Sequence, residues 1–283
     1  MDKTCSVSVL APAKLNLTLK VFGKRPDGYH DIRSLMVPIS LYDMVTVTGI
    51  PQGIEVLSDR PGVPSGSDNS CGKAAGLFLA WAGVTSGVRI RIRKVIPMEA
   101  GLGGGSSDAA ATFKGLTALT GAEPPPDVLR DMAAKVGADV PFFTVGGAAL
   151  AEGIGERLTP LTWSVPFHAV VVKPPFGMPT AEGYARLRRG PGEAPGENAF
   201  EPPRDWDALV GCVDNDFEGA WAGVYPQVDA IKRQLLDAGA GTAAMTGSGS
   251  SIFGLFREEG KAREAQGALS RDTGNTIFLA RNI

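Results

Sequence analysis

Long apolar runs are missing from the sequence, and their absence argues against a helix that spans a membrane. No run approaches the roughly 18 apolar residues that such a span needs. Cysteine and histidine are also scarce, since the chain has only Cys5, Cys71, Cys212, His30 and His168. This set provides neither a disulfide framework nor the spacing of a zinc site.

Neither sign of charge dominates the chain, whose formal net charge is −2. Because no long basic block occurs, the composition argues against a nucleic-acid-binding protein, although a small anionic ligand needs only local donors. The first residues, MDKTCSVSVLAPAK, lack the apolar region of a signal peptide and include Asp2. We therefore expect a soluble, cytoplasmic protein.

The chain has an ordinary globular balance, with 43% hydrophobic and 20% charged residues among 283. Apolar residues alternate from Val7 to Val21, with an interruption at Pro12, and again from Val88 to Ile92, which predicts β-strands. Further strands are expected at 43–50, 53–58, 169–173 and 251–256. Helices are expected at 69–83, 109–121, 127–137 with Asp127 as its cap, and 225–241.

Strands and helices mix in this pattern without regular βαβ alternation, so the sequence predicts an α+β fold. The length favours two domains, and we place the boundary near residue 155. The segment 186–207 is rich in proline, glycine and charge and is expected to be an exposed connection.

The most distinctive stretch is IPMEAGLGGGSSDAAATF, in which Gly101 and the three glycines 103–105 lie between a predicted strand and a predicted helix. Glycine lets backbone N–H groups approach a ligand closely, and a helix N-terminus adds unpaired donors and the positive end of a dipole. The stretch therefore predicts an anion site, especially for phosphate. A flexible loop capped by Ser106 is the alternative.

Three well-known nucleotide sites do not match this stretch. A Walker A loop needs a lysine after the glycines, and none follows. A dinucleotide fingerprint needs a third glycine where Ser106 stands, within a βαβ unit that is absent. Protein kinases need H-R-D and D-F-G segments, and neither occurs.

Three more segments accompany the glycine stretch: APAKLNLTLKVFGKRPDGYHDIRSL near the start, GADVPFF at 137–143 and MTGSGSSIFGLF at 245–256. Together and in this order, the four segments closely resemble the GHMP kinase superfamily of small-molecule kinases. The resemblance implies ATP and an acceptor alcohol in a cleft between two domains. An ATP-binding domain would cover residues 1–155 and a substrate domain residues 156–283.

The resemblance implies that the glycine stretch wraps the phosphates of ATP, the co-substrate, and that Ser107 helps to hold Mg²⁺. Asp108 either supports the metal or only compensates the helix dipole. Asn69 and Lys94 match positions near the adenine. The expected ATP contacts are Asn69, Lys94, Pro97, Met98, Glu99, Ala100, Gly101, Leu102, Gly103, Gly104, Gly105, Ser106 and Ser107.

The resemblance assigns the catalytic roles to Lys14 and Asp139. Asp139 would accept or orient the proton of the acceptor hydroxyl, and Lys14 would offset charge near the transferred phosphoryl group. Without the other motifs, Asp139 would be a turn residue after Gly137 and Lys14 a surface lysine on a strand.

The acceptor implied by the DGYH segment is a small molecule that carries a cytidine diphosphate. Tyr29 and Tyr184 would enclose the cytosine ring and His30 would read its edge, although Tyr184 could also serve helix packing. A second glycine turn would brace the ATP loop and the substrate diphosphate, or be a simple turn. The expected acceptor contacts are Asn16, Tyr29, His30, Thr180, Tyr184, Gly247, Ser248 and Gly249.

Other functions remain open from the residues. A homoserine, mevalonate or sugar kinase of the same superfamily has no use for a cytidine clamp. A non-catalytic nucleotide-binding module is disfavoured by Lys14 and Asp139, and a serine hydrolase by the lack of a G-x-S-x-G elbow. The segment 186–207 offers only Asn198 as a match. We expect a monomer or weak homodimer without nucleic-acid or membrane partners.

Overall fold

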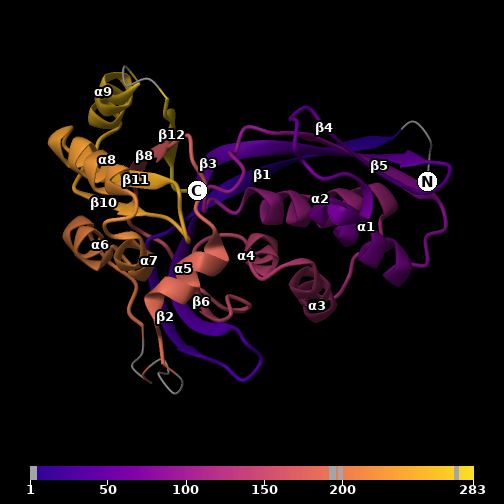
Figure 1. The fold of residues 1–283 in the computed structure, drawn as a ribbon. Coiled ribbons are helices and arrows are strands. Elements are labelled where there is room, and N and C mark those ends of the chain that lie inside the picture. The colour runs from indigo at the N-terminus through magenta and orange to yellow at the C-terminus, as the bar shows by residue number, and fades with distance from the viewer. Residues whose placement is uncertain (1–4, 191–195, 197–199, 271–273) are drawn as a thin grey trace. The chain divides into compact units, whose positions relative to one another are not determined.

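The computed structural model describes residues 5–190, 196, 200–270 and 274–283, which form two compact units (Figure 1). Of these residues, the first unit contains 5–13, 42–98 and 103–146, and the second contains 14–41, 99–102 and the remainder. None of the helices within these ranges is both long enough and apolar enough to cross a membrane. The predicted division into 1–155 and 156–283 stays a prediction.

The strands of the first unit follow the alternation of apolar residues. They are most of β1 (Ser6–Asn16), the second half of β3 (His30–Ile50), β4 (Ile54–Ser58) and β5 (Gly87–Arg93). β5 pairs antiparallel with β3 and parallel with β4. Val88, Ile90 and Ile92 are buried, whereas Arg91 and Arg93 are exposed, as a strand with one solvated face requires.

The helices of the first unit pack on one another, and some of them also contact these strands. They are the short 3₁₀ helix η1 (Gly66–Asp68), α1 (Ser70–Trp81), α2 (Gly104–Thr120), α3 (Pro126–Val136) and α4 (Val140–Val145). α1 and α2 lie side by side (Figure 1). Gly115 lets α2 approach the strands closely, because a Cβ there would press on Val47 and also reach Val9. α2 ends at the left-handed Gly121, as predicted.

The strands of the second unit come from two separate parts of the chain. They are β2 (Thr18–Lys24), the first half of β3, β6 (Ala149–Gly153), β7 (Arg157–Pro160), β8 (His168–Lys173), β9 (Asp214–Asn215), β10 (Thr242–Met245), β11 (Ile252–Phe256) and β12 (Thr276–Arg281). β10, β11, β8 and β12 form an antiparallel sheet in that order. β3 pairs with β2 and with β6.

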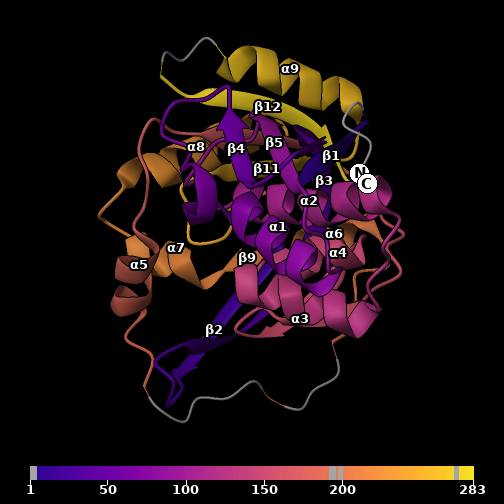
Figure 2. The same cartoon turned by 90° about the vertical axis from the view of Figure 1, so that its right-hand side faces the viewer.

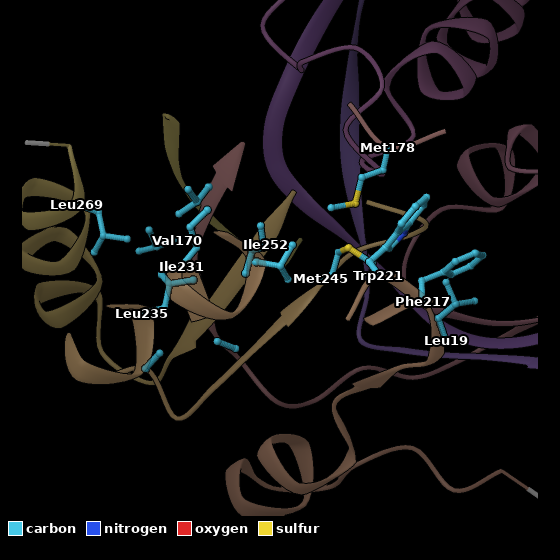
Figure 3. Close-up of a cluster of buried hydrophobic side chains, with 14 of the residues drawn as sticks. Leu19, Val170, Met178, Phe217, Trp221, Ile231, Leu235, Met245, Ile252 and Leu269 are labelled. Atoms are coloured by element: carbon cyan, nitrogen blue, oxygen red, sulfur yellow. The ribbon is translucent and has the colours of Figure 1, made fainter. Parts of the chain in front are cut away.

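The core of the second unit lies between that sheet and its helices, α5 (Thr180–Leu187), α6 (Trp206–Cys212), α7 (Asp216–Trp221), α8 (Pro226–Asp237) and α9 (Glu259–Leu269). α8 packs on β10 and β11, and α9 packs on β8 and β12 (Figure 1). Figure 2 shows α9 lying along β12. Ile231, Leu235 and Leu269 from these helices meet Val170 and Ile252 from the sheet (Figure 3). Each such buried aliphatic side chain stabilises the fold by about 1.5–3 kcal/mol.

Two local expectations were wrong. β1 continues through Pro12 to Asn16, because a strand tolerates proline wherever its nitrogen is not needed for pairing. The N-cap of α3 is Pro125, and Asp127 instead lies in the first turn, where its charge suits the helix dipole. The other predicted strands and helices are confirmed, with α2 beginning five residues earlier than expected, at Gly104 rather than at residue 109.

Two glycines in α1 predict opposite effects of alanine on stability. A Cβ on Gly72 would collide with the carbonyl oxygen of Gly66, whereas a Cβ on Gly76 would only reach ordinary contact with Ile54. Gly72→Ala should lower the free energy of unfolding by about 1–3 kcal/mol through overpacking. Gly76→Ala should raise it by up to about 1 kcal/mol, because alanine favours the helix interior.

Urea denaturation of both variants measures these changes directly. The two positions share one helix, so each is the matched control for the other. Changes of the same sign in both variants would contradict this description of how α1 packs.

Candidate active site

The glycine-rich segment has the backbone conformation that its glycines permit. Gly101 and Gly103 have positive φ angles of 72° and 71°, and α2 begins directly after them. The N-cap is Gly103 and not Ser106, so the alternative of a loop capped by Ser106 was wrong. The first N–H groups of α2 are therefore available to an anion, as at other helix N-termini.

Two oxygen atoms near this helix start have no hydrogen-bond partner among the described residues: Ser107 Oγ and Asp108 Oδ1. Both residues are buried, with 1% and 3% of their surface exposed. An unsatisfied buried oxygen is costly, and hard cations such as Mg²⁺ prefer oxygen ligands. Ser107 Oγ and Asp108 Oδ1 are thus oxygens of the type that such a cation prefers.

Lys94 lies beneath the same helix in a buried charge cluster. Its ammonium group donates to Asp43 and, over 2.8 Å, to Asp108. Burial disfavours the charged form of Lys94, but Asp108 and Asp43 outweigh it and raise the pKa of the ammonium. Burial raises the pKa of Asp108 to about 7, against the lowering effect of Lys94. The predicted contact of Lys94 with adenine stays a prediction.

Asp43 also fixes the segment that leads into the glycines. Its Oδ1 accepts hydrogen bonds from Val95 N over 2.6 Å and from Ile96 N over 2.8 Å. The carboxylate is fully buried and shared between a cation and two backbone donors, which are the conditions for a strong interaction. The cluster therefore ties β3 and α2 to the residues that precede Pro97.

Asn69 has a structural task in this fold. Its Oδ1 caps α1 by accepting from Cys71 N over 2.8 Å, and its Nδ2 donates to Pro64 O over 2.8 Å. Both the oxygen and the nitrogen of the Asn69 amide are thus engaged in hydrogen bonds within the protein. Its predicted place in the ATP site stays a prediction.

Residues 99–102, in the second unit, contact the turn between β10 and β11. Ser251 N donates to Ala100 O over 3.2 Å, and Thr246 Oγ1 lies 3.3 Å from Gly101 O. A Cβ on Gly101 would collide with the Thr246 carbonyl oxygen. Glu99 also has a positive φ of 50°, which is rare for a residue with a side chain and tends to occur at functional sites.

Lys14 and Asn16 belong to a buried polar chain in the second unit. Lys14 is 3% exposed, so it is not a surface lysine, and its ammonium donates to Asn16 Oδ1. Asn16 Nδ2 donates to Ser34 Oγ over 2.7 Å, and Ser34 Oγ donates to Thr18 O over 2.6 Å. Asn16 N donates to Thr246 Oγ1 over 3.0 Å, which links the chain to the second glycine turn.

His30 and Tyr184 form a stacked pair of rings. Their centroids are 5.1 Å apart and their planes differ by 16°. His30 Nδ1 lies 2.9 Å from Phe22 O, and because a carbonyl only accepts, Nδ1 carries a proton there. In the neutral ring, Nε2 is then an acceptor. Tyr29 is 60% exposed.

The second glycine turn also meets α5. Thr180 Oγ1, at the start of α5, lies 2.8 Å from Ser248 Oγ. Gly247 and Gly249 have positive φ angles of 59° and 99°, so both use conformations that favour glycine. The structure thus places the expected acceptor residues in the second unit, where Asn16 contacts the catalytic candidate Lys14, His30 stacks on Tyr184, and Thr180 contacts Ser248.

Asp139 belongs to the first unit, at the N-cap position of α4. Among the described residues of α4, no backbone N–H donates a capping hydrogen bond to the Asp139 side chain. Ordinary helix capping therefore does not account for a carboxylate at this position. Asn198 lies outside the described residues.

Sequence reasoning missed Asp43, Ser34, Thr246 and Asn215, which hold the predicted site residues in place. Only Asn215 had a sequence signal, since Asn215 and Glu218 have the spacing of a capping box. That pattern predicts a helix start, which α7 confirms, but not a contact with a turn 30 residues away.

Family models match both parts of the chain. The model for the GHMP kinases N terminal domain matches residues 69–147, and the model for the GHMP kinases C terminal matches residues 207–275. A 4-diphosphocytidyl-2-C-methyl-D-erythritol kinase from Pelotomaculum thermopropionicum is 40% identical over 282 residues, covering 98% of each chain. A kinase of the same name from Geobacter metallireducens is 41% identical and covers 98% of this chain and 99% of its own.

Solved structures agree with this result. A 4-(cytidine 5'-diphospho)-2C-methyl-D-erythritol kinase superposes with a TM-score of 0.79 at 37% identity, covering 97% of this chain and 99% of its own. A homoserine kinase from Cytophaga hutchinsonii has a TM-score of 0.77 at 19% identity, covering 99% of this chain and 96% of its own, and shares the fold alone. The two-part family match and the full-length similarity show that the chain belongs to the GHMP kinases.

Proposed function

We propose that the protein transfers the γ-phosphoryl group of ATP to the 2-hydroxyl of 4-diphosphocytidyl-2-C-methyl-D-erythritol, in the non-mevalonate route to isoprenoid precursors. The observation that carries the proposal is the stacked His30–Tyr184 pair in the second unit, with Lys14 and Asn16 in the same unit. A flat aromatic platform suits a nucleobase and is of no use to homoserine or mevalonate. Relatives about 40% identical over the full length have this activity in their names.

The base is selected by its hydrogen-bonding edge. Because Nδ1 of His30 is engaged by Phe22 O, Nε2 of the neutral ring accepts, which matches the amino group of cytosine and not the carbonyl of uracil. Tyr29 covers the ring from the exposed side, and the Thr180–Ser248 pair and the turn of Gly247 and Gly249 bind the diphosphate.

Phosphoryl transfer is carried by two groups of opposite charge. The acceptor oxygen forms a bond to the γ-phosphorus as the bond to the ADP oxygen breaks, and the hydroxyl proton passes to the Asp139 carboxylate. The Lys14 ammonium, oriented by Asn16 Oδ1, stabilises the negative charge on the phosphoryl oxygens. The backbone N–H groups at the start of α2 bind the ATP phosphates.

Mg²⁺ is the metal that the buried oxygens fit. Ser107 Oγ would hold it, and Asp108 Oδ1 is a second oxygen without a partner in the described part of the chain. When bound, Mg²⁺ neutralises charge on the nucleotide phosphates. The described residues contain no group of three or more His, Cys, Asp or Glu side chains that could hold a metal. Mg²⁺ usually takes only one or two protein ligands, together with phosphate oxygens and water.

The proposal also covers the phosphate donor, the two domains, the cellular compartment and the oligomeric state. GHMP kinases use ATP as the phosphate donor, and this kinase acts on a small molecule. We propose that residues 1–155 bind ATP, that residues 156–283 bind the acceptor, and that the protein works in the cytoplasm as a monomer or weak homodimer without nucleic acid.

The acceptor can be identified by supplying alternatives in parallel. ADP release should depend on the cytidine diphosphate alcohol, with homoserine, mevalonate and galactose giving no release above background. The uridine analogue should lose at least about a hundredfold in kcat/KM, because His30 Nε2 then faces a carbonyl. Equal rates with homoserine or mevalonate would reject the proposed acceptor, and ATP binding without turnover on any acceptor would indicate a binding module.

The catalytic assignment predicts loss of turnover without loss of folding. Asp139→Asn should lower kcat by about a hundredfold or more, since it removes the proton acceptor. Lys14→Met keeps the buried stem and should lower kcat by a similar factor. Steady-state assays with both substrates saturating measure kcat, and circular dichroism checks folding. Asp127→Asn, an exposed change in the same unit as Asp139, is the control and should keep wild-type turnover.

The ring pair predicts an effect on acceptor binding. Tyr184→Leu should raise the KM for the acceptor at least about tenfold, since base stacking contributes about 1–3 kcal/mol, while Tyr184→Phe should stay near wild type. Tyr225→Leu breaks a different stacked pair, with Phe176, and should leave this KM unchanged. If Tyr184→Leu and Tyr225→Leu have the same acceptor KM, the ring pair has no role in recognition.

A further inference from the structure

The turn between β10 and β11 is held by side chains from α7 and the residue before it. Asn215 Nδ2 donates to Met245 O over 2.7 Å and to Gly247 O over 2.9 Å. Glu218 Oε1 accepts from Met245 N over 2.7 Å, and Trp221 Nε1 donates to Ser248 O over 3.1 Å. One short segment thus contacts the backbone of three residues in or beside the turn.

Asn215 is the centre of this arrangement. It is 3% exposed, and its Oδ1 accepts from Phe217 N over 3.0 Å, which caps α7. The orientation of the amide follows from its partners, because the two carbonyls only accept and the N–H only donates. Both amide hydrogens are therefore used on Met245 and Gly247, and the oxygen is used on the cap.

The backbone of Asn215 is itself anchored to the strand that follows Asn16. β9 pairs parallel with β2, with Thr18 opposite Asp214 and Leu19 opposite Asn215. Asp214 N also donates to Leu17 O over 3.1 Å. Asn215 therefore connects the turn to the chain segment that carries Lys14 and Asn16.

The turn needs such an anchor because its sequence does not define one conformation. Gly247 and Gly249 lack side chains, and glycine loses more conformational freedom on ordering than any other residue. In a trans peptide, C=O and N–H point in opposite directions. Holding the Gly247 carbonyl toward Asn215 therefore turns the Ser248 N–H the other way and keeps a carbonyl oxygen away from an anion.

We propose that Asn215 is a positioning residue for the acceptor: its side-chain amide fixes the Met245 and Gly247 carbonyls so that the turn presents N–H and hydroxyl groups to the substrate diphosphate. This inference rests on the proposed function. Packing supports a fixed turn, because Trp221 and Met245 lie with Met178 in the buried cluster (Figure 3). A Cβ on Gly249 would strike the sulfur atoms of Met178 and Met245.

Two substitutions separate this role from helix capping. Asn215→Ser keeps an oxygen that can cap α7 but has no donor for the two carbonyls. Asn215→Asp keeps the size and the cap but sets an oxygen against both carbonyls. Each should raise the KM for the cytidine diphosphate alcohol at least about tenfold and lower kcat, whereas the KM for ATP should change less than about threefold. Either variant decides the question if the other fails to fold.

Asp205→Ala is the matched control. Asp205 caps α6 by accepting from Ala208 N over 2.8 Å, a hydrogen bond that does not involve the turn between β10 and β11. Its loss should lower the melting temperature and leave both KM values and kcat unchanged. A merely structural Asn215 would give the same result as this control, with a lower melting temperature and wild-type kinetics, and that result would overturn the inference.

The wild-type assay distinguishes the two levels of the argument. If the wild-type protein does not turn over the cytidine diphosphate alcohol, the proposed function fails and the role of Asn215 fails with it. If the wild type is active and both Asn215 variants keep its kinetic constants, only the role of Asn215 is rejected. If the wild type is active and the Asn215 variants have a raised KM for the acceptor with an unchanged KM for ATP, the proposed function and the role of Asn215 are both supported.

Discussion

The close approach of two glycine-rich backbones is the constraint on which the candidate site depends. A side chain on Gly101 would collide with the Thr246 carbonyl, and one on Gly247 would press against the backbone of Gly101. The hydrogen bond from Ser251 N to Ala100 O fixes the same contact. Because the glycines at this contact have no side chains to restrict their backbone, each segment takes its conformation partly from the other and from the residues that hold it.

Those residues are buried, polar and paired, which is why they can hold a defined geometry. Asn16 uses its amide oxygen on Lys14, its amide nitrogen on Ser34 and its backbone N–H on Thr246. In a low-dielectric interior such bonds are strong and an unmade one is costly, so the network favours one arrangement. The ammonium proposed for catalysis is therefore oriented before any substrate binds.

The sequence predicted what depends on local pattern. The alternation in β5, the helical spacing of α1 and α2 and the left-handed Gly121 are all local features, and the structure confirms them. It did not predict that Asn69 caps α1, that Lys94 lies between two aspartates or that β3 spans 21 residues. The Asn69 cap is a local contact with Cys71 that the sequence reasoning overlooked. Lys94 and Asp43 are 51 residues apart, so no periodicity or spacing records their contact.

The buried charges beside the glycine stretch bear on how a phosphate would be held there. Lys94 is close to α2, but its ammonium faces the carboxylates of Asp43 and Asp108, so it contributes little positive potential to a bound phosphate. Two carboxylates with one ammonium, and a pKa of about 7 at Asp108, leave this cluster near neutral or negative. Under the proposed function, the N–H groups at the start of α2 and Mg²⁺ would supply the attraction for the ATP phosphates. Lys14 donates to the uncharged amide oxygen of Asn16, and under the proposed function its ammonium would stabilise the transferred phosphoryl group.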